Sequence, residues 1–382
     1  MSNKHLEILA AIDIGSSKIV TIVCKNDVSK IPAIIAIDQT DGNILKDGLI
    51  QNIEDSINKI KTSLSNVQRK LTFKIDQVIV GIPAFHTTFV NNHGFINLPS
   101  PGTEININDI ADLTKEMCKV PQGSDYLILE LIPQSYSVDD FNNIFTPIGM
   151  CGRILEGDFL IPRIKRNVFE NVSQCMAQAG LTAKKFVLQP IAAAEAVLTE
   201  NDKFSGSILV DIGSKTTSTV IYKGRPKKIS CLNLGGDLIT KEIKDYLSID
   251  LENAEKLKYN YGGLIDGHPG IDIWNKYSNG LQEISTQKIQ SIFVNVIDKI
   301  IDFVINEINN SVLKDKLHNG IVITGGSALI KGLDHYFRIR TGFNTRIGYP
   351  NASLLGNDIK YLNHPSLSTS IGLIIKNSDW DF

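Results

Sequence analysis

Two short segments of this sequence, nearly two hundred residues apart, have the residue types that bind phosphate. The first reads AIDIGSSK at residues 11–18, and the second reads VDIGSKTT at residues 210–217. In each, an apolar run ends in Asp-Ile-Gly, turns through small hydroxyl residues and enters a second apolar run. Glycine lets the backbone approach a phosphate closely, and successive N–H groups in a tight turn form an anion-binding concavity. Because the pattern occurs twice, the sequence predicts two related halves that close on one nucleotide.

Each of these loops carries one aspartate, Asp13 in the first and Asp211 in the second. A carboxylate repels phosphate, but it can hold Mg²⁺ or the water bound to it. We therefore expect the two aspartates to orient Mg²⁺ and water. A single Asp-x-Gly also ends many ordinary strands as a structural turn, so this interpretation depends on the pair.

The elements that must position the loops alternate between strand and helix patterns, which is typical of an α/β protein. In the first part of the chain we expect a hairpin over 6–24, a strand over 31–37, a helix over 55–70 and a strand over 74–81. After the second loop, helices are expected over 234–246, 253–261 and 286–312. A buried strand over 320–324 then runs into Gly325, Gly326 and Ser327, followed by a helix start at Ala328.

The stretch from residue 83 to residue 162 differs in composition, since it holds seven of the chain's 13 prolines. It contains a helix pattern over 108–119 and a strand pattern over 126–133, which predicts a small inserted α+β module. Helical periodicity resumes over 166–179 and ends at Gly180, a typical helix terminator. A strand over 186–188 leads into QPIAAAEAV at residues 189–197, whose small residues suit a helix packed tightly between two domains.

Bulk properties exclude several classes of protein. A length of 382 residues, 42% hydrophobic and 21% charged, predicts a soluble globular protein of two or more domains. A net charge of −2 gives no field that would attract nucleic acid. The five cysteines are scattered without a C-x-x-C pair, as expected for reduced thiols in the cytoplasm. No signal peptide is expected at residues 1–8, and no membrane-spanning helix anywhere.

The motifs together resemble those of the actin-like ATPase superfamily. DIGSSK (13–18), DIGSKT (211–216) and ITGGSA (323–328) resemble its two phosphate motifs and its adenosine motif. Residues 189–197 are similar to its connecting helix between domains. Actins, heat-shock chaperones, sugar kinases, MreB, PilM and FtsA all share this set, so the resemblance implies a fold and a nucleotide without specifying the function.

Two segments of the insertion resemble the FtsA family of bacterial cell-division proteins more specifically. These are IPQSYSVD (132–139) and TPIGMCGRILE (146–156), and AVLTE (196–200) also matches. The resemblance spans about residues 8–375. It implies an α/β, actin-like fold in which two related domains flank a nucleotide cleft, with an FtsA-type inserted α+β subdomain. The implied divisions are 1–82 with 163–190 for the first domain, 83–162 for the insertion, 191–225 with 306–382 for the second domain, and 226–305 for its outer subdomain.

The resemblance also implies a nucleotide site for ATP and Mg²⁺. Asp13 and Asp211 would hold Mg²⁺ through water. The implied nucleotide-binding residues are Gly15, Ser16, Ser17, Lys18, Asp211, Gly213, Ser214, Lys215, Thr216, Gly235, Gly236, Glu255, Lys258, Gly325, Gly326 and Ser327. Glu255 and Lys258 are equally consistent with an ordinary solvated i,i+3 pair, and Lys215 with a solvated loop charge.

The second loop departs from the family pattern. Ser214 and Lys215 replace two glycines, and Ser218 stands where the family has an aspartate. A side chain at a position of close backbone approach can obstruct a phosphate, although Lys215 could instead reach the γ-phosphate. The loss of the acid removes one group that would position water, so we expect ATP binding with weak or absent hydrolysis.

By resemblance, the protein would be a filament-forming scaffold on the cytoplasmic side of the division site. It would bind the C-terminal tail of the tubulin-like protein FtsZ, other copies of itself and, through residues 83–162, downstream division proteins. Nucleic acid is not expected as a partner. The region from Arg225 to Ile305 diverges most from the family, and residues 270–280 show little basic character to meet an acidic tail.

Membrane contact is expected to be peripheral. The family's C-terminal amphipathic helix is not seen in the closing residues 377–382, where Trp380 and Phe382 are flanked by aspartates. Two other readings stay open at this point: a PilM-like pilus-assembly scaffold and a phosphotransfer enzyme similar to a sugar kinase.

Overall fold

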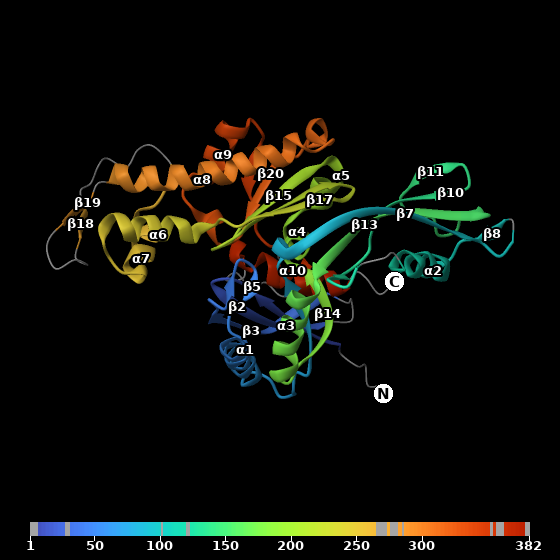
Figure 1. The fold of residues 1–382 in the computed structure, drawn as a ribbon, viewed down its shortest axis with the longest axis horizontal. Helices are drawn as coiled ribbons and strands as arrows, with labels where there is room; N and C mark the ends of the chain where they lie inside the picture. Colours follow the sequence, from blue (N-terminus) through green and yellow to red (C-terminus); the bar gives the residue numbers. More distant parts are fainter. Residues whose placement is uncertain are drawn as a thin grey trace.

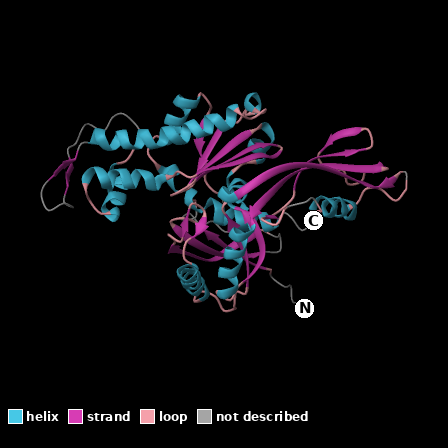
Figure 2. Ribbon diagram, viewed as in Figure 1, coloured by secondary structure: helices cyan, strands magenta, loops and turns pink. Residues whose placement is uncertain are grey.

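Two five-stranded sheets, each covered by helices, stand one above the other in the computed structural model, and a third sheet projects to one side (Figures 1 and 2). The structure describes residues 7–26, 31–100, 102–119, 123–264, 273–275, 282–284, 286–351, 354–356 and 363–378. Residues 270–272 and 276–280 of the divergent segment, and the closing residues Trp380 and Phe382, lie outside these ranges.

The first sheet has the strand order β14-β6-β1-β2-β3. Its strands are β1 (Ile8–Ile14), β2 (Lys18–Asn26), β3 (Pro32–Asp41), β6 (Gln77–Ile82) and β14 (Thr182–Leu188). Helices α1 (Ile53–Gln68) and α3 (Arg166–Gln178) cover it, and the short strands β4 (Leu45–Lys46) and β5 (Leu49–Ile50) follow β3. The expected hairpin and the helix ending before Gly180 are confirmed, with Gly180 at φ +83°.

The second sheet repeats the first, with the order β17-β16-β15-β20-β21. Its strands are β15 (Ser207–Ile212), β16 (Thr217–Lys223), β17 (Arg225–Leu232), β20 (Ile321–Thr324) and β21 (Thr345–Ile347). In each sheet an antiparallel hairpin, β1–β2 or β15–β16, lies beside a parallel strand, β6 or β20. The duplication expected from the two loops therefore extends to the whole sheet.

The outer part of the second half is helical. Its helices are α6 (Gly236–Leu247), α7 (Leu251–Tyr261), α8 (Thr286–Asn309) and α9 (Leu333–Thr341), with the small ladder β18 (Ile273–Asn275) and β19 (Gln282–Ile284). The helix start expected at Ala328 is instead a 3-10 turn, Gly326–Leu329. Ile330 is then extended and Gly332 has φ +77°, so the α-helix begins only at Leu333.

The insertion forms the projecting sheet, with the order β11-β10-β13-β7 and β9 also paired to β13. Its elements are β7 (Thr87–Asn97), β8 (Thr103–Glu104), α2 (Ile107–Cys118), β9 (Tyr126–Ile128), β10 (Ile132–Val138), β11 (Phe141–Ile144), β12 (Cys151–Gly152) and β13 (Ile154–Lys165). The inserted α+β module is confirmed.

The single strand expected over 126–133 is two strands, because residues 129–131 interrupt it, although the Leu129 N–H still donates to the Pro162 carbonyl of β13 at 3.0 Å. β9 pairs with residues 163–165 of β13, and β10 pairs with residues 155–160 of the same strand. Between them, Glu130 turns inward to an ion pair with Lys376. A charged side chain needs such a partner when it is buried, and this partner lies far away in the sequence.

Helix α4 (Gln189–Val197) lies between the two sheets, as its small residues predicted, and contacts strands of both. Helix α10 (Ser368–Ser378) packs on α4 and on β1 and β6 of the first sheet. The crossing is tight, because a Cβ on Gly372 would lie 1.7 Å from the Ala192 carbonyl oxygen. Alanines at positions 192, 193, 194 and 196 are fully buried there. The short helix α5 (Glu200–Ser205) follows α4.

Candidate functional site

The two phosphate-type loops have the same local geometry. In the first, the Gly15 N–H donates to the Lys18 carbonyl at 2.9 Å, and in the second the Gly213 N–H donates to the Thr216 carbonyl at 2.9 Å. A Cβ on Gly15 would come within 2.8 Å of that Lys18 carbonyl oxygen, which explains the glycine. The Asp-Ile-Gly turns are thus equivalent in structure as well as in sequence.

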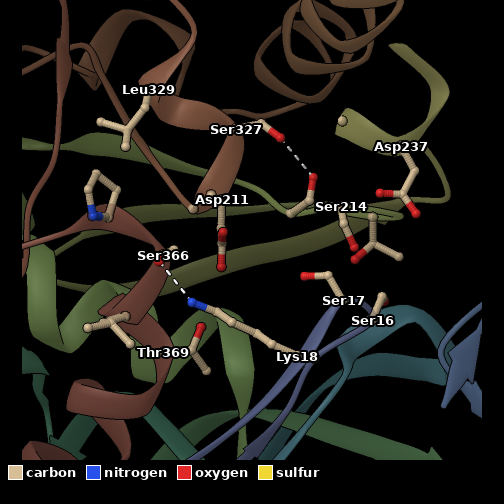
Figure 3. Close-up of a pocket in the computed structure, with 18 of the residues that line it drawn as sticks. Ser16, Ser17, Lys18, Asp211, Ser214, Asp237, Ser327, Leu329, Ser366 and Thr369 are labelled. Atoms are coloured by element: carbon tan, nitrogen blue, oxygen red, sulfur yellow. Dashed lines mark hydrogen bonds between the residues drawn. The ribbon is translucent and has the colours of Figure 1, made fainter. Parts of the chain in front are cut away.

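Both loops open onto one cavity of about 680 Å³ between the two halves of the molecule (Figure 3). This volume lies within the range of small-molecule sites. Of the implied site residues, those that line the cavity are Asp13, Gly15, Ser16, Ser17, Lys18, Asp211, Gly213, Ser214, Thr216, Gly236, Glu255, Lys258, Gly325, Gly326 and Ser327. Lys215 and Gly235 do not line it.

Glycine 235 instead lies behind the second loop. A Cβ there would lie 2.6 Å from the carbonyl oxygens of Gly213 and Ser214. The next two N–H groups, of Gly236 and Asp237, donate to those same carbonyls at 3.0 and 2.7 Å. Gly235 therefore allows the start of α6 to pack directly on the second loop.

The adenosine-type motif also contacts the second loop. Ser327 Oγ donates to the Gly213 carbonyl at 3.1 Å. Gly325 has φ +91°, and a Cβ there would lie 2.3 Å from Asp211 Oδ1 and 2.5 Å from the Ile212 carbonyl oxygen. Only glycine tolerates both this φ and this contact.

Asp13 and Asp211 face the same cavity, and both lose solvation there. Burial raises the pKa of Asp13 to about 6, although Lys18, Gln189 and Ser370 oppose the shift. Burial, followed by repulsion from Asp13, raises the pKa of Asp211 to about 7. Two carboxyls that resist ionisation together are suited to a divalent cation, which would neutralise both.

The donor set fits a magnesium–nucleotide complex. The Ser214 hydroxyl is buried in the second loop without a hydrogen-bond partner, so it has an unused donor on the side of the cavity that this loop forms. Hard oxygen ligands such as these aspartates are the type that Mg²⁺ prefers. Within the described ranges, no group of three or more His, Cys, Asp or Glu forms a metal cluster.

Lys18 projects into the cavity from β2 (Figure 3). Its Nζ donates to Ser366 Oγ at 2.9 Å and to Gln39 Oε1 at 3.0 Å. Burial lowers its pKa, and Asp13 opposes that shift. Its charge interacts with Asp13, and its role as a cation beside the phosphates stays a prediction.

The sequence leaves Lys215 open between a phosphate ligand and a solvated loop charge, and in the structure its side chain bonds to the first half of the molecule. Its Nζ donates to Asn43 Oδ1 at 2.8 Å and to the Leu45 carbonyl at 2.9 Å, both in the first half. Glu255 and Lys258 form the i,i+3 ion pair that was left open, at 2.7 Å, yet both also line the cavity. The Lys258 side chain is only 14% exposed and its Nζ donates to Thr240 Oγ1 at 2.9 Å.

Several lining residues escaped the motif-based reasoning. Gln189 Nε2 donates to Asp13 Oδ1 at 2.8 Å and to the Ile14 carbonyl at 2.9 Å. His364, Ser366 and Thr369 come from the segment that enters α10. Gln189 begins the segment 189–197, whose small residues predicted a helix between the domains, but the sequence reasoning gave Gln189 itself no role at the site. The segment 364–369 gives no signal, because only the packing of α10 brings it to the cavity.

Comparison with known proteins agrees with this architecture. The family model for the "SHS2 domain inserted in FTSA" matches residues 85–161, and that for "Cell division protein FtsA" matches residues 208–372. FtsA of Neisseria meningitidis is 28% identical over 96% of this chain and 89% of its own length. FtsA of Pseudomonas aeruginosa is 26% identical over 97% and 89%.

The chain belongs to the FtsA family. The resemblance drawn from the insertion motifs is therefore confirmed, and with it the actin-like fold class.

Solved structures agree on the fold beyond the FtsA family. The "PilM-PilN type IV pilus biogenesis complex" contains a chain with a TM-score of 0.71 and 15% identity, covering 97% of this chain and 99% of that one. MreB5 of Spiroplasma citri, in a structure bound to ADP, has a TM-score of 0.58 and 18% identity over 97% and 98%. At these identities the likeness concerns the fold alone. Among the described residues, no helix is both long and apolar enough to cross a bilayer.

Proposed function

We propose that this FtsA-family protein is an ATP-binding scaffold of bacterial cell division. It polymerises, and it links FtsZ to the membrane and to downstream division proteins. The observation that supports the proposal best is the single cavity shared by two equivalent Asp-Ile-Gly loops, in a chain that also carries the FtsA-type insertion. ATP acts in this proposal as a structural ligand that biases closure of the two halves and assembly.

In this proposal the phosphates lie between the two loops. The backbone N–H groups and hydroxyls of Ser16, Ser17, Ser214 and Thr216 receive them, and Lys18 contributes a positive charge. Asp13 and Asp211 hold Mg²⁺ through water, and the cation offsets phosphate charge when it is bound. The adenosine lies between α7, with Glu255 and Lys258, and the turn that begins at Gly325.

Weak or absent hydrolysis is part of the proposal. Ser218 lines the cavity, but its hydroxyl donates to Cys231 Sγ at 3.4 Å and cannot act as a carboxylate base. The localisation proposed is the cytoplasmic face of the membrane at the division site. Downstream partners would bind the insertion, residues 83–162, and the FtsZ tail would bind the second half.

Three measurements test the proposal. Calorimetry should detect Mg-ATP binding, with little turnover, and electron microscopy should detect filaments when ATP and a lipid monolayer are present. A peptide with the sequence of an FtsZ C-terminal tail should capture the protein, while a scrambled peptide should not. Failure to bind ATP would refute the nucleotide role. If the protein binds ATP but the peptide does not capture it, the result would favour a PilM-like scaffold. The TM-score of 0.71 keeps that scaffold as the second candidate. Rapid turnover that depends on an added sugar would indicate a phosphotransfer enzyme.

A further inference from the structure

A lysine of the second phosphate loop bonds to the opposite half of the molecule. Lys215 stands where the family has a glycine, and its Nζ donates to Asn43 Oδ1 at 2.8 Å and to the Leu45 carbonyl at 2.9 Å. Hydrogen bonds from a charged donor are about twice as strong as neutral ones. This contact crosses the gap between the halves at the level of the nucleotide cavity, which Leu45 itself lines.

A second bond runs in parallel from the same half. Asn233, between β17 and α6, donates through Nδ2 to Asp47 Oδ1 at 2.6 Å. Both bonds end on one segment, residues 42–48, which we name the acceptor loop. Asn43 and Asp47 each have positive φ, +50° and +53°, so the loop has a specific, tightly turned conformation.

The acceptor loop is itself fixed to the first phosphate loop. The Gly42 N–H donates to the Ser17 carbonyl at 2.8 Å, and the Asn43 N–H donates to the Ser16 carbonyl at 3.0 Å. A Cβ on Gly42 would lie 2.6 Å from the Lys18 nitrogen, so the two segments are in direct backbone contact. A continuous chain of protein contacts therefore joins one phosphate loop to the other without using a phosphate.

We propose that Lys215 and Asn233 form a latch that holds the two halves closed over the nucleotide and slows its release. The inference rests on the proposed nucleotide binding, but closure itself does not require a ligand. When the halves separate, both latch bonds must break, whereas α4 and the turn into α10 can act as the connection about which they move. The latch thus assigns a role in nucleotide retention to a residue that replaces a phosphate-loop glycine.

A direct role for Lys215 as a phosphate ligand makes a different prediction. A γ-phosphate ligand would discriminate ATP from ADP. A latch acts on both nucleotides alike, because its acceptors belong to the protein. It also depends on the acceptor loop, so a change at Asn43 should have less effect once Lys215 has been altered.

The first experiment measures nucleotide dissociation by stopped flow, with fluorescent ATP and ADP analogues and excess Mg²⁺. Lys215→Met keeps the aliphatic length and removes the ammonium. We expect dissociation of both nucleotides to become about tenfold faster or more, since the variant loses two bonds from a charged donor and one such bond corresponds to about tenfold. Lys215→Arg should restore most of the wild-type rate, and Lys299→Met, at an exposed lysine of α8 in the same half, should leave it unchanged.

Asn43→Gly provides the matched change on the acceptor side, since glycine accepts the positive φ at this position. Dissociation should again become faster, by a smaller factor because the Leu45 carbonyl remains. The double variant with Lys215→Met should be no faster than Lys215→Met alone. Additive effects, or an effect confined to the ATP analogue, would overturn the latch.

The second experiment uses nucleotide-free protein, so that failure of the proposed function and failure of the latch give different results. Spin labels at Lys61 on α1 and Asp245 on α6, both exposed, report the distance between the halves, after Cys118→Ser and Cys151→Ser remove the exposed native thiols. Wild type should give one short distance, and Lys215→Met a broader and longer distribution. Identical distributions would refute the latch, whatever the protein does with ATP.

Discussion

At the scale of single residues, the cavity is defined by two carboxyls that share one enclosed space. Asp13 accepts from Gln189 at 2.8 Å and from Ser370 at 3.3 Å, yet burial still raises its pKa to about 6. Asp211 lies against Gly325, and burial together with repulsion from the charge of Asp13 raises its pKa to about 7. These shifts have a direct consequence for stability.

The nucleotide-free protein should become less stable as pH rises from about 4 to about 7. The ordinary pKa of both aspartates is 3.8, so between about pH 4 and 7 the folded chain keeps protons that the unfolded chain has released. The stabilising contribution of the two protonated carboxyls is complete below pH 4, and it is lost as the pH rises through their pKa values in the folded chain. Asp211→Asn should flatten this part of the profile by an amount on the order of a few kcal/mol, since one pKa unit is about 1.4 kcal/mol. Urea unfolding at several pH values measures the difference, and parallel profiles for the variant and wild type would contradict the assignment.

Two adjacent glycines offer a matched test of the adenosine-type turn. Gly325→Ala should lower the free energy of unfolding by roughly 2–4 kcal/mol and weaken nucleotide binding, because of its φ of +91° and the 2.3 Å approach to Asp211. Gly326→Ala serves as the control for stability alone, since the nearest atom to its Cβ is 3.8 Å away. Thermal unfolding of both variants checks the contrast in stability, and nucleotide titration of Gly325→Ala against wild type checks the binding; equal stability of the two variants would contradict the explanation.

At the scale of elements, α10 connects parts of the chain that are distant in sequence. It packs on α4 through Gly372. The turn before it supplies His364 and Ser366 to the cavity, and its own first turn supplies Thr369. Near its C-terminal end, Lys376 donates to Glu130 at 2.8 Å, with side-chain exposures of only 7% and 18%. The same Glu130 separates β9 from β10, so one ion pair joins α10 to the insertion.

Breaking that pair should be costly. Lys376→Met should lower the free energy of unfolding by roughly 3 kcal/mol, because it leaves the Glu130 carboxylate buried without a cation. Adding Glu130→Leu should recover most of this loss, since two apolar side chains can replace a buried ion pair at little cost. Denaturant unfolding of Lys376→Met, Glu130→Leu and the double variant measures this double-mutant cycle. A double variant less stable than Lys376→Met would show that the charge is not the cause.

At the scale of the whole molecule, the insertion contacts the second half as well as the first. The Arg225 guanidinium, at the start of β17, lies 4.1 Å from the centre of the Phe145 ring, and Gln134 Nε2 donates to the Pro226 carbonyl at 2.9 Å. β17 belongs to the sheet whose β15–β16 turn is the second phosphate loop. Movement of the second half relative to the first would therefore be transmitted to the insertion through these contacts.

Removing this contact should loosen the insertion while the fold remains intact. Arg225→Ala should increase hydrogen exchange in β10 and β11 and change global stability by about 1 kcal/mol or less, as for other cation–π pairs. Arg153→Ala, at an exposed arginine of the insertion, is the control. Unchanged exchange in β10 and β11 would show that the insertion is held by the first half alone.

The elements next to the loops could be predicted because their signals are local. Alternating and helical hydrophobic patterns gave the β1–β2 hairpin, α1, α2 and α3, and the Asp-Ile-Gly turns depend only on neighbouring backbone. The break between β9 and β10 and the late start of α9 could not be predicted, since each follows from a partner or a backbone turn that hydrophobic pattern does not encode.

The sequence by itself determined the family and the actin-like fold. Its motifs also named fourteen residues that line the cavity, out of sixteen implied for nucleotide binding, and Asp13 joins them there; Gly235 and Lys215 do not line it. Only the tertiary structure decided what surrounds the aspartates, because Gln189 and Ser370 reach Asp13 through the packing of α4 and α10. It alone also decided where Lys215 lies. A flexible side chain takes the partner that the folded chain places within reach, and for Lys215 that partner is the opposite half of the molecule.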